Sequence, residues 1–355
     1  MSFLTQTTRR LLHTTRRCLV TDEKSRIKRQ IHEVGAIIPP NEFTYVATPK
    51  TVEIIGAPMT AGQPLLGTDR GPELIRSLGL GGRLAKLGWR VSDIGDLEFP
   101  SPEPKDPQTK HGHAKNSVAV GKGNKLLADA VEDAISKGRF PLVVGGDHSI
   151  AFGSLAGVLR NNPDTSVLWV DAHADINTPL TSPSGNMHGM PLGYFLGLPG
   201  FETDKVPGLE WMADVPKLAP EKLVYVGLRD VDSGEVEALR SLNCTCYSMS
   251  HVDKYGIGKL MEMAMEKLGH NSPIHMSFDI DSCDPIEAPS TGTTVRGGLS
   301  YREAHYVCEA VSESGRLASM DIVEVNPMLS KGKGAEATAD LALALTESAL
   351  GNRIL

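Results

Sequence analysis

The 355-residue sequence has few cysteines, few aromatic residues and no long hydrophobic run. Its five cysteines are an odd number and include no CxxC pair. This argues against a disulfide framework or a zinc ribbon and favours a reducing compartment. No apolar run approaches the roughly 20 residues of a membrane-spanning helix, so we expect no membrane partner. The net charge of −7 and the lack of clustered lysine and arginine in the body argue against nucleic-acid binding.

The first 20 residues differ from the rest of the chain. They include several threonines and no acidic residue, the first being Asp22, and four arginines at Arg9, Arg10, Arg16 and Arg17. An arginine-rich, acid-poor amphipathic segment is typical of a mitochondrial transit peptide, and the alternative is a disordered basic tail. We expect residues 1–20 to direct the protein to the mitochondrial matrix, residues 21–50 to form a linker and residues 51–355 to form a single catalytic domain.

From about residue 50, short β-rich runs alternate with helical patterns such as 301–315. This alternation predicts an α/β fold with a parallel sheet covered by helices on both faces. Several runs are apolar throughout, as burial on both faces requires. The predicted strands are 51–58, 89–97, 140–147, 167–172, 223–230, 244–249, 274–281 and 317–325.

Acidic and histidine side chains follow four of these strands. The carboxyl ends of the strands carry Asp147, His148, Asp171, His173, Asp175, Asp279, Asp281, Asp284, Glu324 and Asn326. Ligands of open parallel sheets bind beyond those ends, so we expect these side chains to lie together. Burying so many carboxylates without positive charge is costly, and these motifs contain no lysine or arginine.

Divalent cations would supply the missing positive charge. Several carboxylates with two imidazoles fit two ions better than one. This donor set favours Mn²⁺, with Zn²⁺ or Fe²⁺ as alternatives, and the histidines disfavour Ca²⁺. Two neighbouring metals can activate water for attack on an electrophilic carbon. The pattern therefore predicts a hydrolase but does not name its substrate.

Five motifs, taken together and in this order, resemble the ureohydrolase (arginase) family. They are GGDHSIA (145–151), DAHADINTP (171–179), SGNMHGMP (184–191), SFDID–DP (277–285) and DIVEVNP (321–327). The resemblance covers nearly the whole body. It implies a three-layer α/β/α sandwich around an eight-stranded, mostly parallel sheet. It also implies hydrolysis of L-arginine to L-ornithine and urea on two Mn²⁺ ions per subunit.

The resemblance also implies a role for each of several residues. The ligands of one ion would be His148, Asp171, Asp175 and Asp279. The ligands of the other would be His173, Asp171, Asp279 and Asp281. Asp175 would also orient the attacking hydroxide, Glu324 would pair with the substrate guanidinium, and His188 would move a proton to the leaving amine.

A site for arginine differs from one for agmatine because arginine has an α-carboxylate and an α-ammonium. Candidates for the carboxylate are Asn177, Ser182 and Ser184. Candidates for the ammonium are Asp232 and Glu235, with Asp230 in support, and Thr293 is a further candidate substrate contact. The local pattern favours arginine, and agmatine hydrolysis is the alternative.

Two other hypotheses are a catalytically silent ureohydrolase-like subunit or metal store, and a deacetylase-type amide hydrolase with a single metal.

The sequence also departs from the usual family pattern at Met190, Ser282 and Cys283. A homotrimer is expected because Arg302-Glu303 resembles the family's intersubunit pair.

Overall fold

The computed structural model describes residues 42–102, 113–202, 206–330 and 333–353. The predicted transit peptide (1–20) and most of the predicted linker (21–50) lie outside the described residues. Residues Glu42–Asn352 form one compact unit. In the described part of the chain, no helix combines the length and the hydropathy needed to cross a membrane.

Eight strands form one sheet, and all of their pairings are parallel. The strand order is β2-β1-β3-β8-β7-β4-β5-β6. The strands are β1 (Thr51–Ala57), β2 (Arg90–Asp96), β3 (Phe140–Gly145), β4 (Ser166–Val170), β5 (Leu223–Leu228), β6 (Thr245–Ser248), β7 (Ile274–Asp279) and β8 (Leu317–Val323). The predicted α/β fold is confirmed, and the sheet is wholly rather than mostly parallel.

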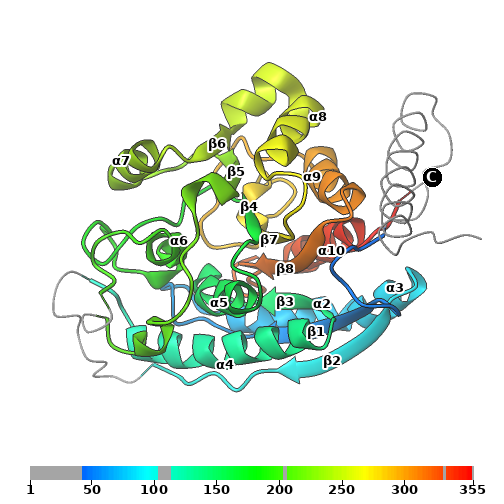
Figure 1. Ribbon diagram of the computed structural model, residues 1–355, viewed down its shortest axis with the longest axis horizontal. Helices are drawn as coiled ribbons and strands as arrows, with labels where there is room; N and C mark the ends of the chain where they lie inside the picture. The colour runs from blue at the N-terminus through cyan, green and yellow to red at the C-terminus, as the bar shows by residue number, and fades with distance from the viewer. Residues whose placement is uncertain (1–41, 103–112, 203–205, 331–332, 354–355) are drawn as a thin grey trace, which may run out of the picture. The chain divides into compact units, whose positions relative to one another are not determined.

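Nine α-helices accompany the strands in the described residues (Figure 1). They are α2 (Gly71–Ser77), α3 (Leu80–Lys86), α4 (Ser117–Ser136), α5 (Ala151–Asn161), α6 (Pro191–Phe195), α7 (Ser233–Leu242), α8 (Met249–Lys267), α9 (Tyr301–Glu313) and α10 (Lys333–Ala349). The long helices α4 and α5 pack side by side on one face of the sheet.

The sheet separates two hydrophobic cores. Strand β4 shows how the sequence supplies both: Leu168 and Val170 join one core, whereas Val167 and Trp169 join the other. The alternation follows from the two-residue period of a strand. One core includes residues of α2, α3, α8, α9 and α10, and the other includes residues of α4, α5, α6 and α7. These layers explain why β4 is apolar throughout.

The predicted strands agree with the observed ones to within two residues at each end. Most of the differences are at the carboxyl ends, where the structure ends the strand sooner. Strand β4, for example, ends at Val170, so that Asp171 already belongs to the following loop. Four neighbouring strands, β3, β8, β7 and β4, end beside one another and precede the candidate site residues.

Candidate metal centre and substrate cleft

The six predicted metal ligands converge at the carboxyl ends of the central strands. The Nδ1 atom of His148 lies 3.1 Å from a carboxylate oxygen of each of Asp171, Asp175 and Asp279. The Nδ1 atom of His173 lies 3.1 Å from Asp281 Oδ2 and 3.4 Å from Asp171 Oδ1. These side chains form two groups whose donor atoms are close enough together to bind a metal ion. The groups are His148–Asp171–Asp175 and Asp171–His173–Asp281.

These donor atoms fit metal ions. His148 Nδ1 is buried and has no hydrogen-bond partner, although it faces three carboxylates at equal distance. Donors bound about 2.1 Å from one metal and at right angles to one another are about 3 Å apart, which is close to this spacing. Carboxylates with imidazoles form a donor set for Mn²⁺, Zn²⁺ or Fe²⁺ rather than for Ca²⁺. The geometry therefore supports a binuclear metal centre.

Two side chains from the core orient the His148 imidazole. Its ring stacks on the Trp169 ring, with centroids 4.1 Å apart and an interplanar angle of 7°. Its Nε2 atom lies 2.8 Å from Ser277 Oγ, so Nδ1 faces the carboxylates. Trp169 Nε1 also donates a hydrogen bond to Asp171 Oδ2 at 2.9 Å. Trp169 and Ser277 are register partners on β4 and β7, which explains why they act together.

The DxH and DxD spacings have a common backbone explanation. Asp171 Oδ1 accepts a hydrogen bond from the His173 N–H at 2.7 Å, and Asp279 Oδ1 accepts one from the Asp281 N–H at 2.8 Å. An aspartate that accepts the N–H two residues later closes a tight turn. The turn brings the second ligand back beside the first, so this spacing places two donors at one site.

The cluster carries excess negative charge. Burial, together with the charges of Asp281 and Asp171, raises the pKa of Asp279 well above its usual range. Burial and the Asp171 charge raise the pKa of Asp175 to about 6. Carboxylates crowded in this way gain from a divalent cation, which displaces protons when it binds.

A cleft of about 120 Å³ lies beside the metal-binding groups. It is lined by His173, Asp175, Asn177, Ser182, Ser184, Asn186, His188, Gly189, Asp232, Glu235, Asp279 and Thr293. Most of the predicted substrate contacts are in this list. Asn186 and Gly189 were not predicted, although they lie within two residues of His188 in the SGNMHGMP motif. Their position in this motif could have identified both residues as part of the cleft.

The sequence is similar to those of known proteins over nearly all of its described length. The model of the Arginase family matches residues 50–351. The chain belongs to the arginase family. It is 44% identical to "Arginase" of Glaciozyma antarctica over 89% of this chain and 92% of that protein. It is 44% identical to "Arginase-1" of Mus musculus over 86% of this chain and 94% of that protein.

Solved structures of the arginase family have the same fold. The arginase of Bacillus subtilis superposes with a TM-score of 0.78 at 40% identity, covering 86% of this chain and all of that chain. The arginase of Bacillus caldovelox superposes with a TM-score of 0.80 at the same identity and coverage. These likenesses confirm the predicted ureohydrolase fold and enzyme class.

Glu324 is an arginase-family motif residue that the structure buries behind His188. Its backbone has φ 65°, a left-handed conformation that non-glycine residues seldom adopt. Its Oε1 atom accepts the His148 N–H at 2.8 Å and lies 3.1 Å from His188 Nδ1. Both of these contacts use Oε1, and no hydrogen bond to Oε2 is found among the described residues. Glu324 itself does not line the cleft.

The remaining substrate candidates form a hydrogen-bonded wall of the cleft. Asn177 Nδ2 donates to Asp232 Oδ2 at 3.0 Å, and Ser182 Oγ accepts the Gly185 N–H at 2.9 Å. Glu235 is buried, and its two oxygens accept the N–H groups of Ile176 and Asp232 at 3.1 and 3.0 Å. It therefore holds α7 against the metal-binding loop in addition to lining the cleft.

The structure places Asp230 outside the residues that line the cleft, and its supporting role toward the substrate ammonium stays a prediction. Its side chain is exposed and does not line the cleft. The backbone at this position is held in place, because the Asp230 N–H donates to Ala172 O at 3.1 Å. That contact fixes the turn after β5.

Proposed function

We propose that this protein hydrolyses L-arginine to L-ornithine and urea, with two Mn²⁺ ions per subunit. The observation that carries the proposal is the convergence of six histidine and aspartate side chains beside a polar cleft. A relative offers further support: "Entamoeba histolytica Arginase in complex with L-Ornithine" is 30% identical over 85% of this chain and 98% of that chain, with a TM-score of 0.74.

The two ions would be held by separate sides of the cluster. His148 and Asp175 would bind one ion, His173 and Asp281 would bind the other, and Asp171 and Asp279 would contact both. When bound, the ions would supply Lewis-acid activation of water at neutral pH. Asp175 reaches the cleft and so is placed to orient the attacking water by accepting a hydrogen bond.

Glu324 and His188 would act on the guanidinium and on the leaving amine. Oε2 of Glu324 would accept a guanidinium N–H, and a charge-assisted bond of this kind is strong. Burial opposes protonation of His188, but the hydrogen bond and charge of Glu324 raise the pKa of His188 to about 9. The ring is therefore protonated near neutral pH and can donate the proton that ornithine's side-chain amine needs to leave.

Replacing His188 with asparagine should lower kcat by roughly 10²–10⁴-fold, the usual contribution of a general acid or base. The metal content should not change, because His188 contacts Glu324 rather than a metal-binding atom. Urea release and metal analysis on the same sample measure both quantities. His270→Asn, at an exposed turn, is the matched control. Equal activity in the two variants would remove His188 from the reaction.

The choice of arginine over agmatine rests on the polar wall of the cleft. Asn177, Ser182 and Ser184 offer donors for an α-carboxylate, and Asp232 offers a negative charge for an α-ammonium. Urea release should therefore have a higher kcat/KM with L-arginine than with agmatine, which lacks the carboxylate. Preference for agmatine would instead make the protein an agmatinase.

We also propose import into the mitochondrial matrix, supported by the four arginines and the absence of acidic residues in residues 1–20. Mass spectrometry of the protein isolated from its native cells should detect an N-terminus that begins after this segment. An intact Met1 on the native protein would contradict import.

We propose a homotrimer because Arg302 and Glu303, at the start of α9, resemble the family's intersubunit pair. Within this chain, Arg302 forms two hydrogen bonds with Glu309 at 2.9 and 2.5 Å, and Glu303 Oε2 accepts the Ser300 N–H at 2.9 Å. Light scattering of the purified protein should give the mass of three chains, and the mass of one chain would contradict the assembly.

A further inference from the structure

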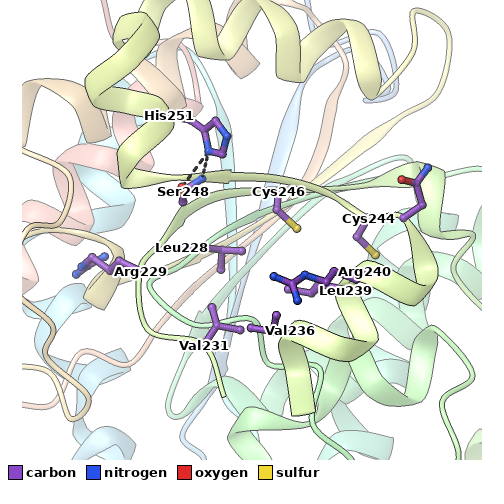
Figure 2. Close-up of a pocket in the computed structure, with 11 residues that line it drawn as sticks. Leu228, Arg229, Val231, Val236, Leu239, Arg240, Cys244, Cys246, Ser248 and His251 are labelled. Carbon is purple, nitrogen blue, oxygen red and sulfur yellow. Dashed lines mark hydrogen bonds between the residues drawn. The ribbon is translucent and has the colours of Figure 1, made fainter. Parts of the chain in front are cut away.

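Arg229 follows β5 directly and lies at the edge of a pocket of about 740 Å³ between α7 and β6. In Figure 2 its guanidinium is directed away from the other labelled residues of the pocket. The metal-binding loops lie in that direction, as the contacts of the guanidinium establish.

The main chain of Arg229 binds the first of these loops. Its N–H donates to Ala172 O at 2.9 Å, and the next residue donates to the same oxygen at 3.1 Å. Ala172 stands between Asp171 and His173 in the sequence. The backbone at Arg229 therefore fixes the loop that carries two of the proposed ligands.

The side chain of Arg229 binds the second loop. Its Nη2 atom donates to Asp281 O at 2.6 Å and to Cys283 O at 3.2 Å, and its Nη1 atom donates to Ser282 O at 3.0 Å. These three carbonyls belong to the turn that carries Asp281. The guanidinium thus closes around consecutive backbone oxygens, which a rigid, planar, five-donor group does better than an ammonium.

The same guanidinium also reaches a third segment. Its Nε and Nη2 atoms donate to Val295 O at 3.1 and 2.7 Å. Two residues earlier, Thr293 Oγ1 donates to Asp281 Oδ2 at 2.7 Å. Arg229 therefore also fixes the segment that orients the Asp281 carboxylate.

Within the part of the chain that the structure describes, Arg229 forms no ion pair. Each acceptor is a backbone carbonyl, and burial lowers the pKa of the guanidinium. A partly buried arginine without a carboxylate partner costs desolvation energy, and its carbonyl contacts offset that cost. The two loops are also joined directly, because the Ala172 N–H donates a hydrogen bond to Oδ1 of the proposed ligand Asp281 at 3.3 Å.

The two halves of the metal centre are supported differently. His148 is held by Trp169, Ser277 and Glu324, and none of these is among the hydrogen-bond acceptors of the Arg229 side chain. His173 and Asp281 belong to the two loops that Arg229 joins. We propose that Arg229 is a positioning residue that selectively supports the His173–Asp281 side of the metal centre. This inference rests on the proposed two-metal function.

Loss of the Arg229 contacts should weaken one metal more than the other. Removing groups that orient metal ligands typically lowers metal affinity about 10–100-fold. In Arg229→Met, Mn²⁺ bound after dialysis at limiting free metal should therefore fall from about two ions per chain to about one. Arg229→Lys keeps the charge but loses the fork geometry, so its affinity for the second ion should be intermediate.

Arg240→Gln is the matched control. Arg240 lines the same pocket (Figure 2) but makes no hydrogen bond to either loop among the described residues. Its metal content and urea release should equal those of the unaltered protein. The thermal unfolding of all metal-free variants should be measured as well, because a general loss of stability would lower the affinity for both ions together.

Metal analysis over a range of free Mn²⁺, with the electron paramagnetic resonance of the coupled Mn²⁺ pair, decides the proposal. The expected result is loss of the coupled signal with one ion retained in Arg229→Met, or in Arg229→Lys if the methionine variant does not fold. Parallel loss of both ions, or retention of both at all concentrations, would overturn the selective role. Failure of the unaltered protein to bind two ions would instead overturn the proposed function itself, independently of the variants.

Discussion

Replacing Asp171 with asparagine should abolish both metal binding and urea release. Asp171 Oδ2 lies 3.1 Å from His148 Nδ1, and Asp171 Oδ1 lies 3.4 Å from His173 Nδ1, so one carboxylate serves both groups. Asparagine keeps the shape but removes the charge. Breaking a buried charge pair costs about 3–5 kcal/mol, or roughly 10²–10⁴-fold, and here both ions lose a ligand.

The matched control for Asp171→Asn is Asp164→Asn. Asp164 is exposed, forms an ion pair with Lys222 at 2.6 Å and does not line the cleft. Both proteins should be dialysed against Mn²⁺, analysed for bound metal and assayed with L-arginine. Two ions and undiminished activity in Asp171→Asn would remove this residue from the metal centre.

Replacing Glu324 with glutamine should separate catalysis from metal binding. The proposed guanidinium partner loses its charge, so kcat/KM should fall by roughly 10²–10⁴-fold, again about 3–5 kcal/mol. Glutamine can still accept the His148 N–H, which Glu324 Oε1 accepts at 2.8 Å. Both ions should therefore remain bound, unlike the outcome for Asp171→Asn.

The control for Glu324→Gln is Glu262→Gln, in an exposed pair with Lys259 on α8. Metal analysis and urea release should be measured on both variants, together with a thermal unfolding curve. Normal kcat/KM in Glu324→Gln would contradict its proposed contact with the guanidinium. Loss of metal in the same variant would assign Glu324 to the metal centre instead.

The sequence predicted the fold and the metal-binding cluster because the governing patterns are local. Apolar runs bounded by helices identified the parallel strands. The DxH and DxD motifs identified ligands, because each spacing corresponds to a turn closed by a hydrogen bond between neighbouring residues, as for Asp171 and His173. The topology then placed the ends of β3, β4, β7 and β8 side by side.

Residues whose role depends on distant partners were not predicted. The apolar strand predicts only that Trp169 is a core residue. The fold shows that its ring stacks on His148 and that its indole N–H donates a hydrogen bond to Asp171. Apart from Gly227 O, the partners of the Arg229 side chain are backbone carbonyls more than 50 residues away, which no side-chain pattern discloses. Asp230 was predicted to support the contact with the substrate ammonium because of its motif, and the motif could not show that its side chain does not line the cleft.

The central claim is that a two-metal site in this chain hydrolyses L-arginine. The most direct measurement combines metal analysis with urea release by the purified full chain, with and without added Mn²⁺. We expect about two Mn²⁺ ions per chain and arginine-dependent urea release that is lost on chelation and restored by Mn²⁺. Urea release that persists without bound metal, or no release from L-arginine by protein carrying two ions, would contradict the account.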